Sequence, residues 1–193
     1  LMHSGRYAMH EDAVAPSAIR APINKVTPRE LSTAEVERTV EDFANAAHLA
    51  QRAGYDGVEI MGSEGYLINE FLVAHTNERT DRYGGSDAAR RRFATEIVRR
   101  VREATGPDFL IMYRLSALDL VPDAQQFAQV LELGREIEAA GGRALAVQAD
   151  VGHPDDVERL FDTVQTGLGG LHALVNNAGT LERQARVDEF DPA

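Results

Sequence analysis

Apolar residues recur at the spacing of an α-helix in three long stretches of the chain. The first helix is predicted to begin after an N-cap at Ser32 or Thr33 and to end at Gly54. The second is predicted over residues 87–104 and the third over residues 123–140. One stripe of each helix should face inward. The stripes contain Val36, Val40, Phe43, Ala47 and Ala50, then Phe93, Ile97, Val98 and Val101, and finally Phe127, Val130, Leu131, Leu133 and Ile137.

Short apolar runs alternate with these helices and are typical of buried strands. This alternation predicts an α/β fold of repeated βα units, with a mostly parallel sheet and right-handed crossovers. Strands are expected at residues 1–3, 57–62, 109–113, 144–149 and 171–175, with a further helix over residues 154–166.

The segment between the first expected strand and the first helix, residues 4–31, is rich in proline and has little periodicity. It is predicted to be an irregular loop. Loops of this length are usually functional or disordered. Taken without other information, the nearby His3 is more simply interpreted as a solvated side chain.

Composition limits the class of protein. The chain has 193 residues, fewer than the roughly 250 of a complete eight-stranded barrel. A net charge of −11 argues against nucleic acid and anionic membrane surfaces as partners. The absence of cysteine excludes disulfides and thiolate-held metals, and no metal site is expected. No apolar run approaches about 20 residues, so a cytoplasmic protein is expected.

Polar side chains follow two of the expected strands. A glycine-spaced loop presents Tyr66 after one strand, and Arg114 ends the other. The carboxyl ends of parallel strands are where α/β proteins place their sites. Structural alternatives stay open, in which Tyr66 packs on Phe71 and Arg114 pairs with Glu59 or Asp119. An arginine at the end of an apolar strand needs such an anion or acceptor.

Two further groups of charged residues have a structural interpretation. Arg79, Asp81 and Arg82 are predicted to brace a loop. The arginine-rich runs at residues 90–92 and 99–102 are predicted to form a solvated helix face, and contact with an anionic ligand is the less favoured alternative.

The exact residues of the central stretch are more informative than its pattern of apolar and polar positions. YDGVEIMGSEGYLINEFL and the following NERTDRYGGS resemble the old yellow enzyme family, and most closely its 2,4-dienoyl-CoA reductase branch. The resemblance extends from HSGRY to YRLSALDLV. Met61 and Glu64 stand where most members of the family have His and Asn. The 2,4-dienoyl-CoA reductase branch is similar in having Met and Glu at these two positions. Residues 1–141 therefore resemble an internal fragment of an FMN-binding TIM barrel, around its third to fifth strands.

The resemblance implies a set of roles. Tyr66 would donate a proton to the substrate, while Arg114 and His3 would contact FMN. The implied reaction is hydride transfer from reduced FMN to the C=C bond of a small-molecule enone or dienoyl-CoA.

After this part the sequence reads GGRALAVQADVGHPDDVERLFDTVQTGLGGLHALVNNAG, with an apolar run that ends in N-N-A-G. On these residues, 142–193 resemble a different family, the short-chain dehydrogenases, through an internal fragment of their Rossmann fold. The resemblance implies an NAD(P) site. Its residues would be Asp150 and Val151 on the adenine side and the N-N-A-G motif of Asn176, Asn177, Ala178 and Gly179. The family's glycine-rich T-G-x-x-x-G-x-G loop and its Y-x-x-x-K pair do not occur in this sequence.

The chain is therefore interpreted as a chimera of a partial TIM barrel and a partial Rossmann-like segment, joined within residues 135–142. Three functions stay open. They are a weak or inactive flavin-dependent ene-reductase, a non-catalytic α/β scaffold and a residual NAD(P)-binding module. Unpaired strand edges at residues 1–3 and 171–175 predict a homo-oligomer.

Overall fold

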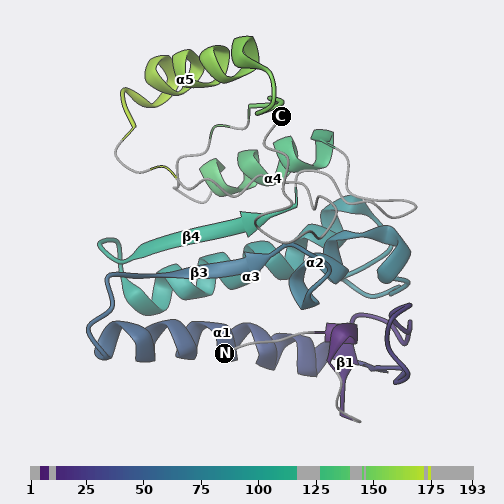
Figure 1. Ribbon diagram of the computed structural model, residues 1–193. Coiled ribbons are helices and arrows are strands. Elements are labelled where there is room, and N and C mark those ends of the chain that lie inside the picture. The colour runs from purple at the N-terminus through teal and green to yellow at the C-terminus, as the bar shows by residue number, and fades with distance from the viewer. Residues whose placement is uncertain are drawn as a thin grey trace, which may run out of the picture. The chain divides into compact units, whose positions relative to one another are not determined.

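The computed structural model describes residues 5–8, 12–116, 127–139, 145, 147–171 and 174. The chain divides into two compact units, Leu1–Ala146 and Val147–Ala193 (Figure 1). Each unit is described by itself.

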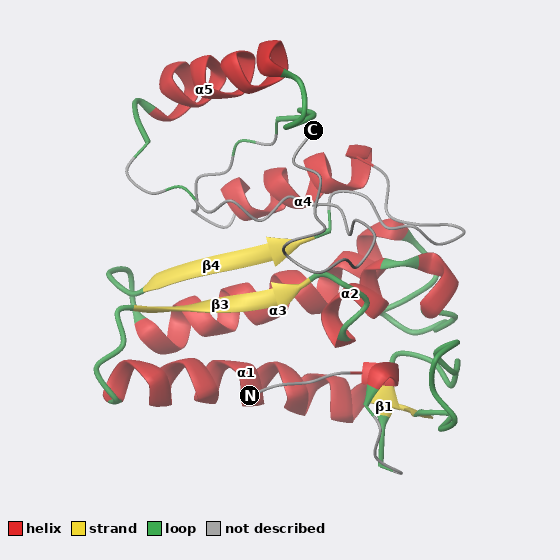
Figure 2. Ribbon diagram, in the orientation of Figure 1, coloured by secondary structure: helices red, strands yellow, loops and turns green. Residues whose placement is uncertain are grey.

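The centre of the first unit is a parallel pair of strands, β3 (Gly57–Gly62) and β4 (Leu110–Leu115). The helices α1 (Thr33–Arg52) and α3 (Asp87–Thr105) pack against each other beside this pair (Figure 2). Because α3 connects the two parallel strands, they form a βαβ unit. The predicted α/β fold with parallel strands is confirmed in the described residues.

Local signals in the sequence set the start of α1. The Ser32 side chain accepts a hydrogen bond from the Glu35 backbone N–H, and the Glu35 carboxylate accepts one from the Ser32 N–H at 2.8 Å. This is a capping box. A hydrogen bond from Arg29, together with those from Ser32, lowers the pKa of Glu35 to about 2. The predicted N-cap is confirmed.

An aromatic cluster closes the core on one side of β3. Phe71 lies 4.2 Å from Phe93 between ring centroids, and Tyr83 meets both rings edge-on. All three residues are fully buried. Phe71 belongs to α2 (Leu67–Leu72), a short helix that the sequence did not predict, and the 3₁₀ turn η2 (Ala74–Thr76) follows it.

Arg79 fixes the long loop to the core. Its buried guanidinium pairs with Asp81 at 2.6 Å, donates to the Pro16 carbonyl at 3.0 Å and donates to the Leu31 carbonyl. The predicted brace is confirmed. The loop is not wholly irregular, because β1 (Val14–Ala15) and β2 (Arg29–Glu30) form a short parallel pair within it.

Two helices complete the described structure. In the first unit, α4 (Phe127–Ala139) is tied to α3 by an ion pair between Glu136 and Arg91 at 2.8 Å. In the second, α5 (Pro154–Leu168) confirms the helix predicted there. The strand predictions around it are wrong for the residues that are described. Residues 145, 147–149, 171 and 174 form no strand. Among the described strands, none forms backbone hydrogen bonds with them as a sheet partner.

Tyr83 is fully buried and Tyr113 has a buried hydroxyl, so the two allow a matched test of the core. The Tyr83 hydroxyl donates to Glu96 at 2.8 Å and accepts from Arg82 at 2.6 Å. The Tyr113 hydroxyl is buried and finds no partner among the described residues. Burial raises the pKa of both phenols. We expect Tyr83→Phe to lower the free energy of unfolding by about 1 kcal/mol, and Tyr113→Phe to leave it unchanged or raise it.

Urea unfolding of both variants beside the wild type measures the difference. An equal loss of stability in the two variants would contradict the assignment of Tyr113 as an unpaired hydroxyl.

Candidate functional site

A tight turn after β3 positions Tyr66. Glu64 and Gly65 both have left-handed backbones, with φ of 62° and 76°. The Gly65 N–H donates to the Asn69 side chain at 2.7 Å. Tyr66 then occupies the N-cap position of α2. A non-glycine residue with positive φ is uncommon, so the fold holds Glu64 in a strained conformation.

A hydrogen bond links the residues that follow the C-terminal ends of β3 and β4. The Glu64 N–H donates to the Ser116 hydroxyl, just beyond β4, at 3.1 Å. A Cβ added to Gly62 would overlap the hydroxyl of Tyr113 on β4. Glycine at this position leaves the space that the Tyr113 hydroxyl occupies. The loop that carries Tyr66 is therefore tied to the end of β4.

Arg114 lies near the end of β4 and is held by two carboxylates. Its guanidinium is 3.0 Å from Glu59 and 3.2 Å from Glu64. The hydrogen bond that its guanidinium donates to Glu64 is the largest cause of its raised pKa. The side chain remains 28% exposed. Pairing with Glu59 is the structural alternative that the sequence left open, whereas Asp119 lies outside the described residues.

Tyr66 is half-buried, and its ring meets Tyr7 edge-on at a centroid distance of 6.4 Å. Tyr7 belongs to η1 (Gly5–Tyr7), a single 3₁₀ turn. In the structural alternative, Tyr66 packs on Phe71. The ring contacts of Phe71 are with Tyr83 and Phe93, whereas the ring contact of Tyr66 is with Tyr7.

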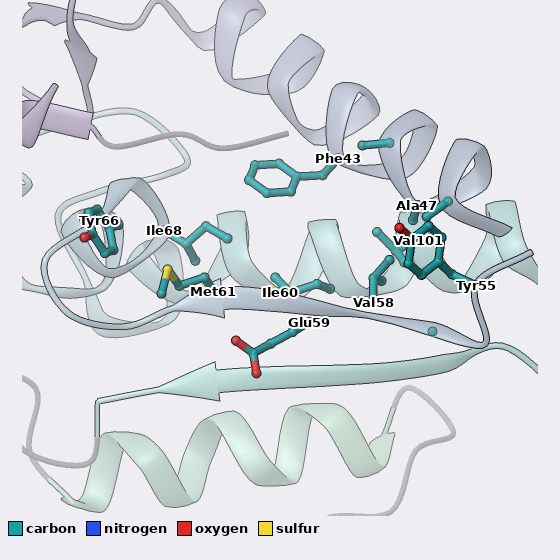
Figure 3. Close-up of a pocket in the computed structure, with 13 residues that line it drawn as sticks. Phe43, Ala47, Tyr55, Val58, Glu59, Ile60, Met61, Tyr66, Ile68 and Val101 are labelled. Atoms are coloured by element: carbon teal, nitrogen blue, oxygen red, sulfur yellow. The ribbon is translucent and has the colours of Figure 1, made fainter. Parts of the chain in front are cut away.

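An apolar cavity of about 380 Å³ lies between α1 and β3 and has Tyr66 at one end (Figure 3). Glu59 borders it but points away from Phe43 and Ile60, towards β4. Arg114 does not line this cavity. Tyr66 therefore borders this cavity, which lies along β3 beside α1, while Arg114 pairs with Glu59 instead.

The arginines of α3 are occupied by protein groups. Arg100 pairs with Glu41 and Glu103, and Arg102 donates to the carbonyls of Gly106 and Phe109. These contacts support the solvated, ion-paired helix face rather than an anion site.

In the second unit, Asp150 forms a local turn. Its carboxylate accepts from the Gly152 N–H at 2.8 Å and lies 3.1 Å from His153, and its N–H donates to Asp156 at 2.8 Å. Val151 is 59% exposed. The other predicted cofactor residues lie outside the described residues: His3, Asn176, Asn177, Ala178 and Gly179.

Sequence analysis did not single out Glu70, a buried carboxyl group on α2 that is 1% exposed. It accepts the Arg6 backbone N–H at 2.8 Å. Burial raises its pKa to about 8. The signal in the sequence was a single acidic residue within the apolar run LINEFL, which an exposed helix face would equally explain.

The geometry defines a class of fold, an α/β fold with polar groups at the ends of adjacent parallel strands. Residues 1–156 match the NADH:flavin oxidoreductase / NADH oxidase family, and the chain belongs to that family. Residues 120–193 match the short chain dehydrogenase family. Both resemblances in the sequence are confirmed. The two matches overlap, so the boundary at residues 141–142 stays a prediction.

Individual proteins agree with this assignment. The chain is 45% identical to a metal reductase of Desulforamulus reducens over 68% of the chain, and 40% identical to an NADPH dehydrogenase of a Geobacillus species over 97%. It spans only 21% and 59% of those relatives' lengths. An old yellow enzyme homologue from Zymomonas mobilis superposes with a TM-score of 0.65 at 29% identity, covering 72% of this chain and 44% of the other.

The described residues contain neither a membrane-spanning helix nor a cluster of metal ligands. No helix there is both long and apolar enough to cross a membrane. No three His, Asp or Glu side chains there lie together as metal ligands would.

Proposed function

We propose that this chain carries one wall of a flavin-dependent ene-reductase site, with Tyr66 as proton donor and Arg114 as the group that stabilises negative charge. The observation that carries the proposal is the link between the loop of Tyr66 and the end of β4, through Glu64 and Ser116. Membership of the flavin oxidoreductase family supports the reaction class. The substrate would be a small molecule with an activated C=C bond, such as an enone or a dienoyl-CoA.

Bound FMN would supply the hydride for this reaction. Addition of a hydride to one carbon of the C=C bond leaves the electron pair on its neighbour, which must take up a proton. The phenol of Tyr66 can give that proton as a general acid. The hydrogen bond from Gly65 to Asn69 and the ring of Tyr7 fix its position.

The described residues fit one edge of such a cofactor. The guanidinium of Arg114 carries a permanent positive charge and is partly exposed at the strand end. It would stabilise negative charge placed beside it. However, Glu59 and Glu64 already neutralise much of this charge. We therefore propose that the chain alone binds FMN weakly and gives no measurable turnover.

A second proposal concerns the two segments and the nicotinamide cofactor. We infer that residues 1–141 form the flavin part and residues 142–193 a nucleotide-binding part, supported by the match to the short chain dehydrogenase family. Asp150 would contact NAD(P), but its carboxylate already accepts from Gly152. Weak NAD(P) binding is therefore expected.

The first test is a titration of FMN fluorescence. We expect weak but saturable binding by the wild type. Arg114→Ala should weaken it at least about tenfold, because a charge-assisted hydrogen bond contributes about 1.5–3 kcal/mol. Glu59→Gln should tighten it, because it removes one of the two competing carboxylates. Tyr66→Phe should not change it.

The variants form a matched set, since a general loss of structure would weaken binding in all of them. Equal affinity of Arg114→Ala and wild type, or weaker binding by Glu59→Gln, would contradict the role of Arg114. No saturable binding by the wild type would remove the site from this chain.

We also propose that the chain self-associates. Among the described strands, β3 and β4 pair only with each other, so each has a second edge without a described neighbour. Such edges pair readily with another chain. Light scattering at increasing protein concentration should show a dimer or larger species, and a constant monomer mass would contradict this proposal.

A further inference from the structure

Glu70 has an unusual environment for a carboxyl group. It lies on α2 among the buried residues Leu67 and Phe71. One of its carboxyl oxygens, Oε1, accepts the Arg6 backbone N–H at 2.8 Å. The other, Oε2, is buried and finds no partner among the described residues. A buried polar atom left unpaired costs about 1–3 kcal/mol, so its retention needs a reason.

The contact between Glu70 and the turn η1 is close and specific. Gly5 has a left-handed backbone with φ of 55°, and a Cβ there would overlap the Glu70 carboxyl group. The turn is fixed on its other side by Asn24, whose amide donates to the carbonyls of Arg6 and Ala8 at 3.2 and 2.8 Å. Glu70 is therefore the point at which α2 fixes the start of the turn.

The same residue is connected to Tyr66. The Glu70 backbone N–H donates to the Tyr66 carbonyl at 2.9 Å, in the first turn of α2. From the other direction, η1 brings the Tyr7 ring to 6.4 Å from the Tyr66 ring. Tyr7 also packs over Gly65, where a Cβ would lie 2.7 Å from its Cε2 atom. Glu70 thus contacts both segments that determine where Tyr66 points.

We propose that Glu70 is a positioning residue that holds the turn Gly5–Tyr7 on α2 and thereby fixes the Tyr7 ring against Tyr66. The positioning itself is a structural property of the chain, whereas its value for proton donation rests on the proposed function of Tyr66.

The protonation state of Glu70 should control this contact. With a pKa of about 8, the carboxyl group is protonated at neutral pH and can accept the Arg6 N–H without a buried charge. Above pH 8 it becomes an anion in an apolar site. Arg6 is the charged group that acts on it, and Tyr7 and His75 are titratable side chains on the adjoining turns η1 and η2. The Arg6 guanidinium lies 5.6 Å from the Tyr7 ring, so attraction between Arg6 and the Glu70 anion should move Tyr7.

The test is NMR of the full chain with ¹³C-labelled tyrosine, between pH 6 and 9. Each signal is assigned with a Tyr→Phe variant. Phenols ordinarily titrate near pH 10, so this range mainly reports other groups. We expect the Tyr7 and Tyr66 signals to shift together with a midpoint near pH 8. Tyr55, which is 67% exposed, serves as the internal control and should not share that midpoint.

Three variants separate the explanations. Glu70→Gln cannot ionise and should keep both signals at their low-pH positions throughout. Glu70→Ala should displace both signals at every pH. Gly5→Ala should displace the same two signals by pushing the turn off the carboxyl group, and it serves if Glu70→Ala does not fold.

Unchanged Tyr7 and Tyr66 signals in the folded Glu70→Ala or Gly5→Ala protein would overturn the proposal. A midpoint near pH 8 that persists in Glu70→Gln would assign the titration to another group and overturn the control by Glu70. The measurement needs no cofactor, so its failure is distinguishable from a failure to bind FMN.

Discussion

The close approach of β3 and β4 at their C-terminal ends is the constraint on which the rest of the first unit depends. Gly62 has no room for a side chain because the Tyr113 hydroxyl occupies that space. The helices α1 and α3 can then cover Ile60 and the neighbouring apolar residues in one core. A parallel pair needs such cover, because both strands present apolar side chains to the helices packed beside them.

The candidate site follows from this approach. The turn at Glu64 and Gly65 reaches Ser116, and α2 begins at once with Tyr66 as its N-cap. The charges are almost self-contained, since Arg114 is neutralised by the neighbouring carboxylates. The carboxyl group of Glu70 is buried where the N-terminal turn meets α2, and its raised pKa keeps it uncharged at neutral pH. The position of the Tyr66 loop at the strand ends is therefore well defined. Because Glu59 and Glu64 already pair with Arg114, an anionic ligand beside it should bind weakly.

Much of this was accessible from the sequence, for physical reasons. Capping residues and long apolar stripes predicted α1 and α3 to within a few residues, and glycine-bounded apolar runs predicted β3 and β4. The helix α2 was missed because all six of its residues are buried, so it has no polar face and no helical period. The pair β1–β2 has only two residues in each strand, too few for a pattern. The burial of Glu70 depends on contacts 64 residues away in the chain, and no local pattern encodes it. The strand predicted at residues 144–149 failed in its described part because an apolar run does not specify a pairing partner.

The most direct test of this structure is an NMR measurement of the nuclear Overhauser effect between the Gly62 Hα protons and the Tyr113 ring. The close packing of Gly62 on Tyr113 predicts a strong cross-peak, together with contacts across the register that pairs Met61 with Arg114. The absence of that cross-peak in the folded protein would contradict the approach of the two strand ends, and with it the link between the loop of Tyr66 and the end of β4.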